Sequence, residues 1–303
     1  MEHSWIAIVV LAAALQTARN AGQKHLSASL STLSTTWVRF GFGLPFAAVY
    51  VAILWKVSSP SILVFDENFL PLCFLASLCQ LAGTALLIVL FRLRNFAIGS
   101  TYVRSEAIIA AFVGVLFFEE ILDFAGWIAV TISVSGVILI SIAKIELGAE
   151  KIARVLSDPS AGIGLLCGLS FGVGSFFIRQ ASLSFENPNF LLTAAITLLT
   201  LLVIQTFSLG LCILIWKRSD FWEIVHMWRP SLFVGITSVL GSIGWFTAMT
   251  IQLVAYVKAL AQIEFIFALL VSWFIFGERS SKFELLGIVL VAAGILVLVL
   301  FAR

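Results

Sequence analysis

The feature that most constrains this chain is a succession of apolar runs, each about long enough to cross a lipid bilayer. A spanning helix needs about 20 predominantly apolar residues, and runs of that kind fall near residues 5–22, 33–55, 69–91, 96–118, 123–142, 160–180, 188–216, 230–250, 253–276 and 283–301. Only helices and closed barrels satisfy the backbone in lipid, and these runs are too long for barrel strands. The sequence therefore predicts an all-α integral membrane protein with ten transmembrane helices.

The balance of residue types supports the same class. Hydrophobic residues make up 61% of the chain and charged residues 11%, whereas a soluble domain carries about 25% charged residues. The cysteines lie inside apolar runs without the spacing of metal ligands, so we expect packing residues at Cys73, Cys79, Cys167 and Cys212. We expect no metal, no cofactor and no nucleic-acid partner. The first apolar run also lacks the basic segment of a cleavable signal.

The two halves of the chain resemble each other at an offset of 158 residues. This offset places Glu106 on Glu264, Gly136 on Gly294, and Phe118-Glu119-Glu120 on Phe276-Gly277-Glu278. We therefore divide the chain into a first five-helix repeat (1–145), a polar linker (146–159) and a second five-helix repeat (160–303). Because five is an odd number, the repeats must be inverted relative to each other in the membrane. Many secondary transporters have this architecture, with a binding site near the midplane.

Several of these features resemble the EamA-like branch of the drug/metabolite transporter superfamily. The run from Gln262 to Glu278, with its glutamate, aliphatic stretch and Gly-Glu pair, is similar to the penultimate helix of that family, and Arg39 stands where its second helix carries an arginine. The chain departs from the family where a proline often follows the intramembrane glutamate, since Ala107 and Phe265 occupy those places. The resemblance implies a secondary transporter that exports a small metabolite.

Lysine and arginine in the loops favour one orientation. The loops that follow odd-numbered spans carry most of these residues, which predicts that those loops are cytoplasmic and that both termini lie outside. Members of the family commonly keep both termini in the cytoplasm, so the orientation stays open.

Two acids lie well inside predicted spans, Glu106 and Glu264. A carboxylate at the bilayer centre costs about 2.5–3.5 kcal/mol even on insertion scales. Both glutamates are therefore candidates for binding a cargo or a coupling proton. The alternative is a structural role, in which each carboxyl group is protonated or bridges helices, with partners supplied by other helices.

Basic residues also occur inside the spans, at Arg19, Arg39, Arg104 and Lys258. The strings Tyr102-Val-Arg104 and Tyr256-Val-Lys258 are alike and lie 154 residues apart, one helical turn short of the repeat offset. With Gln262 and Trp245, these residues would line a cavity suited to a carboxylate or phosphate. Snorkelling of the cations to the interface is the alternative. The full candidate set for substrate binding or coupling is Arg39, Tyr102, Arg104, Glu106, Trp245, Tyr256, Lys258, Gln262 and Glu264.

One motif suggests catalysis but lies in the wrong context. The segment from Gly168 to Gly172 matches the G-x-S-x-G nucleophile pattern, which requires a strand before it and a histidine within reach. Here the motif is in a predicted helix, where its glycines favour close packing. The sequence therefore favours a non-enzymatic carrier for an amino acid, organic anion or related amphipathic solute, working by alternating access in a bacterial inner membrane, with lipid as its surroundings and a proton as candidate coupling ion. A non-transport scaffold or a membrane enzyme is the alternative.

Overall fold

The computed structural model describes residues 4–58, 64–93, 103, 106–143, 159–186, 189–267 and 282–301. Almost all of them are helical. In chain order the helices are α1 (Ser4–Leu26), α2 (Thr32–Gly41), α3 (Leu44–Ser58), α4 (Phe69–Leu93), α6 (Glu106–Phe117), α7 (Phe124–Ala143), α9 (Pro159–Leu183), α10 (Phe190–Trp216), α11 (Asp220–His226), α12 (Trp228–Ile251), α13 (Val254–Leu260) and α15 (Lys282–Phe301).

The predicted all-helical class is confirmed for this part of the chain, where the one extended pairing is an isolated bridge between Phe65 and Phe185. Six helical segments are long and apolar enough to cross a membrane, and α6, α7 and α15 contain shorter apolar helices. Large apolar side chains such as Leu116, Phe207 and Leu211 are exposed on the outside of the bundle. This arrangement fits a protein whose outer surface faces lipid.

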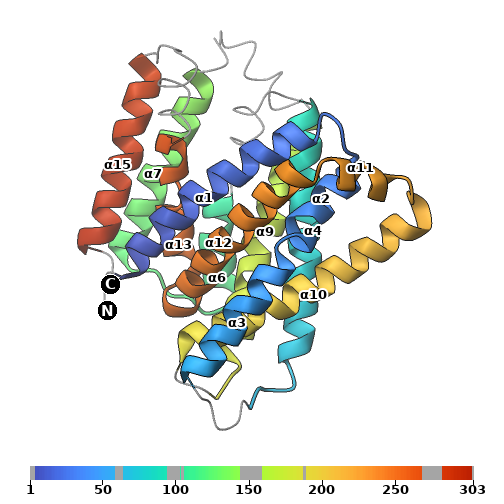
Figure 1. The fold of residues 1–303 in the computed structure, drawn as a ribbon. Coiled ribbons are helices and arrows are strands. Elements are labelled where there is room, and N and C mark those ends of the chain that lie inside the picture. Colours follow the sequence, from blue (N-terminus) through green and yellow to red (C-terminus); the bar gives the residue numbers. More distant parts are fainter. Residues whose placement is uncertain are drawn as a thin grey trace.

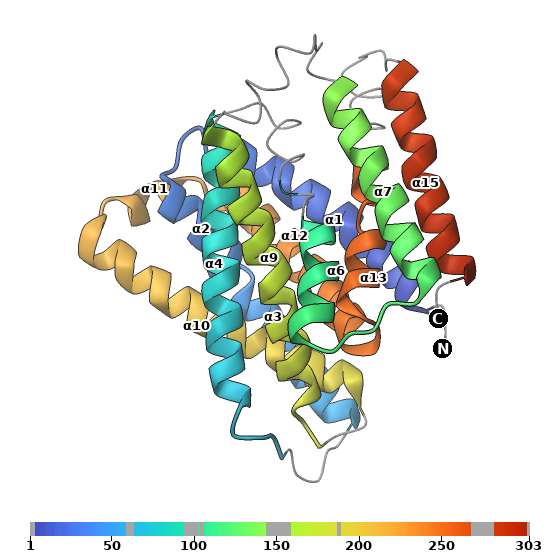
Figure 2. The same cartoon turned by 180° about the vertical axis from the view of Figure 1, so that it is seen from behind.

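The three most extensive helix interfaces join the two halves of the chain. α1 packs on α12, α4 packs on α9, and α7 packs on α15. Each of the first two pairs joins the first helix of one half to the third-span helix of the other. Figures 1 and 2 show α7 and α15 side by side, and the start of α1 at the same end of the molecule as the end of α15. This exchange of equivalent helices is the packing that a two-repeat chain produces.

Glycine allows α7 and α15 to approach closely. A Cβ atom built on Gly136 would lie 2.6 Å from the carbonyl oxygen of Gly287, and one built on Gly294 would overlap Ser133. Small residues of this kind drive helix association in lipid, where burial of apolar surface gives no advantage. Since Gly136 and Gly294 are equivalent in the two repeats, and since Gly136 meets Gly287 while Gly294 meets Ser133, the two helices run antiparallel.

Two of the predicted spans are interrupted. The span at 33–55 is divided at residues 42–43, because Pro45 has no N–H to continue the hydrogen bonds of α2 into α3. The span at 253–276 is divided by a turn at residues 261–262, between α13 and a helical stretch at 263–267. Broken helices at membrane depth commonly line binding cavities.

A partly buried ion pair holds the junction between α12 and α13. Nε of Arg179 lies 3.3 Å from Oε1 of Glu120. The same guanidinium donates to the last carbonyls of α12, including Met249 at 2.5 Å and Gln252 at 2.6 Å, while Glu120 accepts from the backbone N–H of Val254 at the start of α13. The pair therefore satisfies the backbone ends of two helices at once.

The residue before this pair has an unusual backbone. Glu119 has a φ of 54°, which lies in the left-handed region that favours glycine. Its equivalent in the second repeat is Gly277. Glycine adopts this conformation with less strain than glutamate does.

At the opposite end of the bundle, Asp220 fixes α11 to α2. Its carboxylate accepts hydrogen bonds from Ser31 Oγ at 2.5 Å and Ser34 Oγ at 2.6 Å. Burial raises the pKa of Asp220, but the two hydroxyl groups and the charge of Lys217 outweigh burial and hold that pKa below its ordinary value.

Candidate functional site

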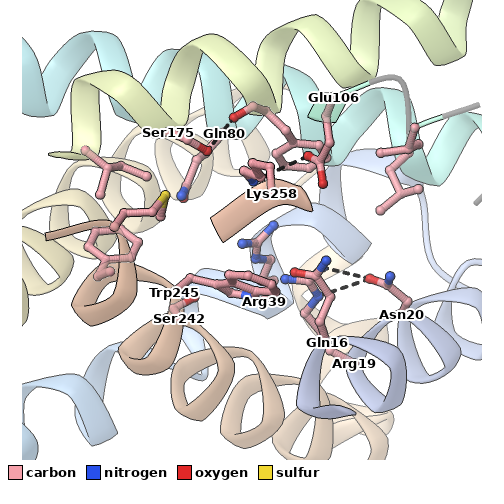
Figure 3. Close-up of a pocket in the computed structure, with 16 residues that line it drawn as sticks. Gln16, Arg19, Asn20, Arg39, Gln80, Glu106, Ser175, Ser242, Trp245 and Lys258 are labelled. Atoms are coloured by element: carbon pink, nitrogen blue, oxygen red, sulfur yellow. Dashed lines mark hydrogen bonds and ion pairs between the residues drawn. The ribbon is translucent and has the colours of Figure 1, made fainter. Parts of the chain in front are cut away.

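A polar cavity lies inside the bundle, between helices of both halves (Figure 3). Its volume is about 60 Å³, which is room for a few water molecules. Gln80 lines the cavity from the centre of α4, which places the cavity near the middle of that helix. The polar lining residues are Gln16, Arg19, Asn20, Arg39, Gln80, Glu106, Ser175, Ser242 and Lys258, and apolar side chains including Phe171, Trp245 and Phe246 complete the wall.

An ion pair between the two repeats crosses one side of this cavity. Nζ of Lys258, in the last turn of α13, lies 3.4 Å from Oε2 of Glu106, in the first turn of α6. Lys258 also lies 5.7 Å from the ring centroid of Trp245. Lys258 is 9% exposed and Glu106 is 4% exposed. The snorkelling interpretation of Lys258 is therefore wrong, because the ammonium points into the bundle.

Arg39 enters the cavity from α2. Its Nε donates to Ser238 Oγ at 3.2 Å and its Nη1 donates to Thr84 Oγ1 at 2.7 Å. The residue is 5% exposed. Within the described residues it has no carboxylate partner.

Glu264 lies beside the cavity and contacts amides that line it. Its carboxylate accepts from Gln16 Nε2 at 3.0 Å and from Asn20 Nδ2 at 3.3 Å, and the Asn20 carbonyl in turn accepts from Arg19 at 2.8 Å. Glu106 in the first repeat and Glu264 in the second repeat therefore each contact residues of the other repeat. The expectation that these partners come from other helices is confirmed.

The other candidates are distributed unevenly. Trp245 lines the cavity. Tyr256 lies elsewhere, since its hydroxyl donates to Asp123 Oδ1 at 2.9 Å near the start of α7. Gln262 lies in the turn after α13, fully buried, with its Nε2 3.5 Å from the carbonyl oxygen of Lys258. Tyr102 and Arg104 lie outside the described residues.

Sequence reasoning missed most of the uncharged part of the lining. Gln16, Asn20, Gln80, Ser175 and Ser242 all contribute to the cavity wall. Their signal was present, because an amide inside an otherwise apolar run is expensive in lipid and must find a partner. The hydroxyl groups carried a weaker signal, since serine in a membrane helix often bonds to its own backbone, as Ser175 does to Phe171.

This arrangement can bind and hold a small polar or charged molecule. Within the described part of the chain no cluster of metal-ligating side chains occurs. Ser170, the centre of the G-x-S-x-G segment, is half-buried on α9 and donates to the carbonyl of Leu166 at 2.8 Å. Cys73, Cys79, Cys167 and Cys212 form no disulfide within the described residues. Both halves of the chain contribute polar side chains to the cavity.

Comparison with known proteins agrees with this two-part architecture. No curated protein matches the sequence significantly. Among 27 similar solved chains, one known as "Crystal structure of protein" shares 15% identity, covers 100% of this chain and 99% of its own, and has a TM-score of 0.70. A likeness at this identity supports a shared fold and says nothing of function. The model of the EamA-like transporter family matches twice, over residues 3–142 and 160–300, so the chain belongs to the EamA-like transporter family and is an integral membrane transporter.

Proposed function

We propose that this protein is a secondary carrier that moves one small metabolite through the cavity by alternating access. In this proposal the chain crosses the membrane ten times in two inverted repeats, with 1–145 and 160–303 as the repeats, in a bacterial inner membrane. Export is the expected direction, by resemblance to the family.

The observation that carries the proposal is a small polar cavity that acidic and basic side chains of both repeats line. Burying Arg39, Lys258 and Glu106 away from water is costly, and all three meet at one place in the bundle. The cavity is also smaller than the roughly 300–1,000 Å³ of most ligand sites. A metabolite could therefore enter only if the helices around it move apart, as alternating access requires.

The Lys258–Glu106 pair also fits a purely structural role, as a bridge between repeats in a non-transport scaffold. A membrane enzyme would need a nucleophile, base or metal at the cavity. Flux separates these possibilities, because neither alternative moves solute across a sealed bilayer.

The direct test is flux into and out of proteoliposomes that hold the purified protein. We expect saturable uptake or counterflow of at least one member of a broad panel of amino acids and organic acids. Trp222→Ala, on the exposed surface of α11, is the matched control and should leave flux unchanged. Absence of flux for the whole panel, in both directions and with or without a pH gradient, would contradict the carrier.

Coupling to protons can be tested in the same vesicles. If Glu264 carries the coupling proton, Glu264→Gln should abolish the pH dependence of flux while exchange at symmetrical pH continues. A pH dependence equal to that of the unaltered protein would remove Glu264 from coupling.

A further inference from the structure

The three cations that line the cavity differ in what neutralises them. Lys258 has the carboxylate of Glu106 at 3.4 Å. Arg19 bonds to the side-chain carbonyl of Asn20 at 2.8 and 3.2 Å. Arg39 contacts two neutral hydroxyl groups, of Ser238 and Thr84. Figure 3 shows its guanidinium extending into the space between Lys258 and Trp245.

The buried guanidinium of Arg39 has N–H donors that no described side chain accepts from. Arginine stays protonated in proteins and offers five N–H donors, of which the two hydroxyl groups take two. Hydroxyl dipoles compensate a buried charge much less than a carboxylate does. Its planar fork matches the two oxygens of a carboxylate.

The acids of the site are already engaged. Glu106 contacts Lys258, and Glu264 accepts from Gln16 and Asn20. A cationic ligand would have to compete with these partners, whereas an anion meets Arg39 directly. Among the described charges the lining has two positive charges in excess, and adjacent Glu264 reduces this excess to one. A single negative charge on a ligand would balance these described charges.

We propose that the cargo is an organic monoanion whose carboxylate binds Arg39, with its apolar part against Trp245, Phe171 and Phe246. This inference rests on the proposed carrier function only where it calls the anion a cargo. Binding of the anion to Arg39 can be tested without transport. It selects the organic anion from the broader class of solutes.

The test compares planar ligands that share a shape and differ in charge. Benzoate, benzamide and benzamidinium, with the smaller set of acetate, acetamide and acetamidinium, are added to the full-length protein in detergent, and thermal unfolding and calorimetric binding are measured. We expect at least one acid to bind saturably and raise the unfolding temperature more than its neutral and cationic counterparts. Arg39→Gln should weaken that binding by more than about tenfold, Arg39→Lys by less, and Arg229→Gln, an exposed control, should not change it.

Tighter binding of the amidinium ions, equal binding of all three charge types, or no response to either acid would overturn the proposal. The ligand series in the unaltered protein decides this even if Arg39→Gln does not fold. Acid binding without any flux would count against the carrier and leave the anion site in place. Flux confined to cations or neutral solutes would support the carrier and overturn the anion site.

Discussion

Removing one member of the Lys258–Glu106 pair should destabilise the protein about as much as removing both. At a separation of 3.4 Å and an effective dielectric constant of about 20, the gross attraction is about 5 kcal/mol. Loss of one partner leaves the other buried and uncompensated, which costs about 3–5 kcal/mol. We therefore expect Glu106→Gln and Lys258→Gln each to lower the free energy of unfolding by about 3 kcal/mol.

The double variant Glu106→Gln/Lys258→Gln should lose much less than the sum of the single variants, with a coupling energy of about 3 kcal/mol. The assay is reversible unfolding in mixed micelles, with Glu67→Gln as a control because Glu67 is exposed. Additive effects of the single variants, with a coupling energy near zero, would refute the claim that this pair joins the repeats.

Further predictions concern the ends of the bundle, and each is checked by chemical or thermal unfolding. Arg179→Ala should cost about 3–5 kcal/mol, because it leaves Glu120 buried without its partner and uncaps α12; Arg179→Lys should recover only part of that loss, since lysine lacks the fork. Glu119→Gly should stabilise the protein by about 1 kcal/mol, because glycine adopts the left-handed conformation without strain. The contribution of Asp220, whose pKa is lowered in the folded protein, is present above the ordinary value of 3.8 and should be lost as the pH falls below it; Asp220→Asn should remove that acid-dependent loss.

The all-helical membrane class could be predicted because long apolar runs are typical of helices that face lipid. The break at residues 42–43 carried a readable signal in Pro45, which lacks the hydrogen-bond donor that α2 would need to continue. The turn at 261–262 has no proline or glycine to mark it. It results from tertiary packing, which local sequence does not record.

The site was predictable in its charges and less so in its geometry. Glu106, Lys258 and Arg39 could be selected because charged side chains are rare in lipid. Trp245 was selected as an aromatic candidate for the cavity wall. Tyr256 was selected with Lys258, but residues two apart on a helix point about 200° apart, so only one could face the cavity. The pairing of Lys258 with Glu106 requires the packing of α13 on α6 and could not be read from either helix alone.

The most direct test of the account asks whether the cavity opens to both sides of the membrane. Ser242→Cys, which lines the cavity on α12, is placed in a variant without the four native cysteines and exposed to an impermeant thiol reagent in right-side-out and inverted vesicles. Leu240→Cys, on the exposed face of the same helix, is the control and should stay unreactive because it faces lipid. The account predicts labelling of Ser242→Cys from either side, and labelling from one side alone under all conditions would contradict it.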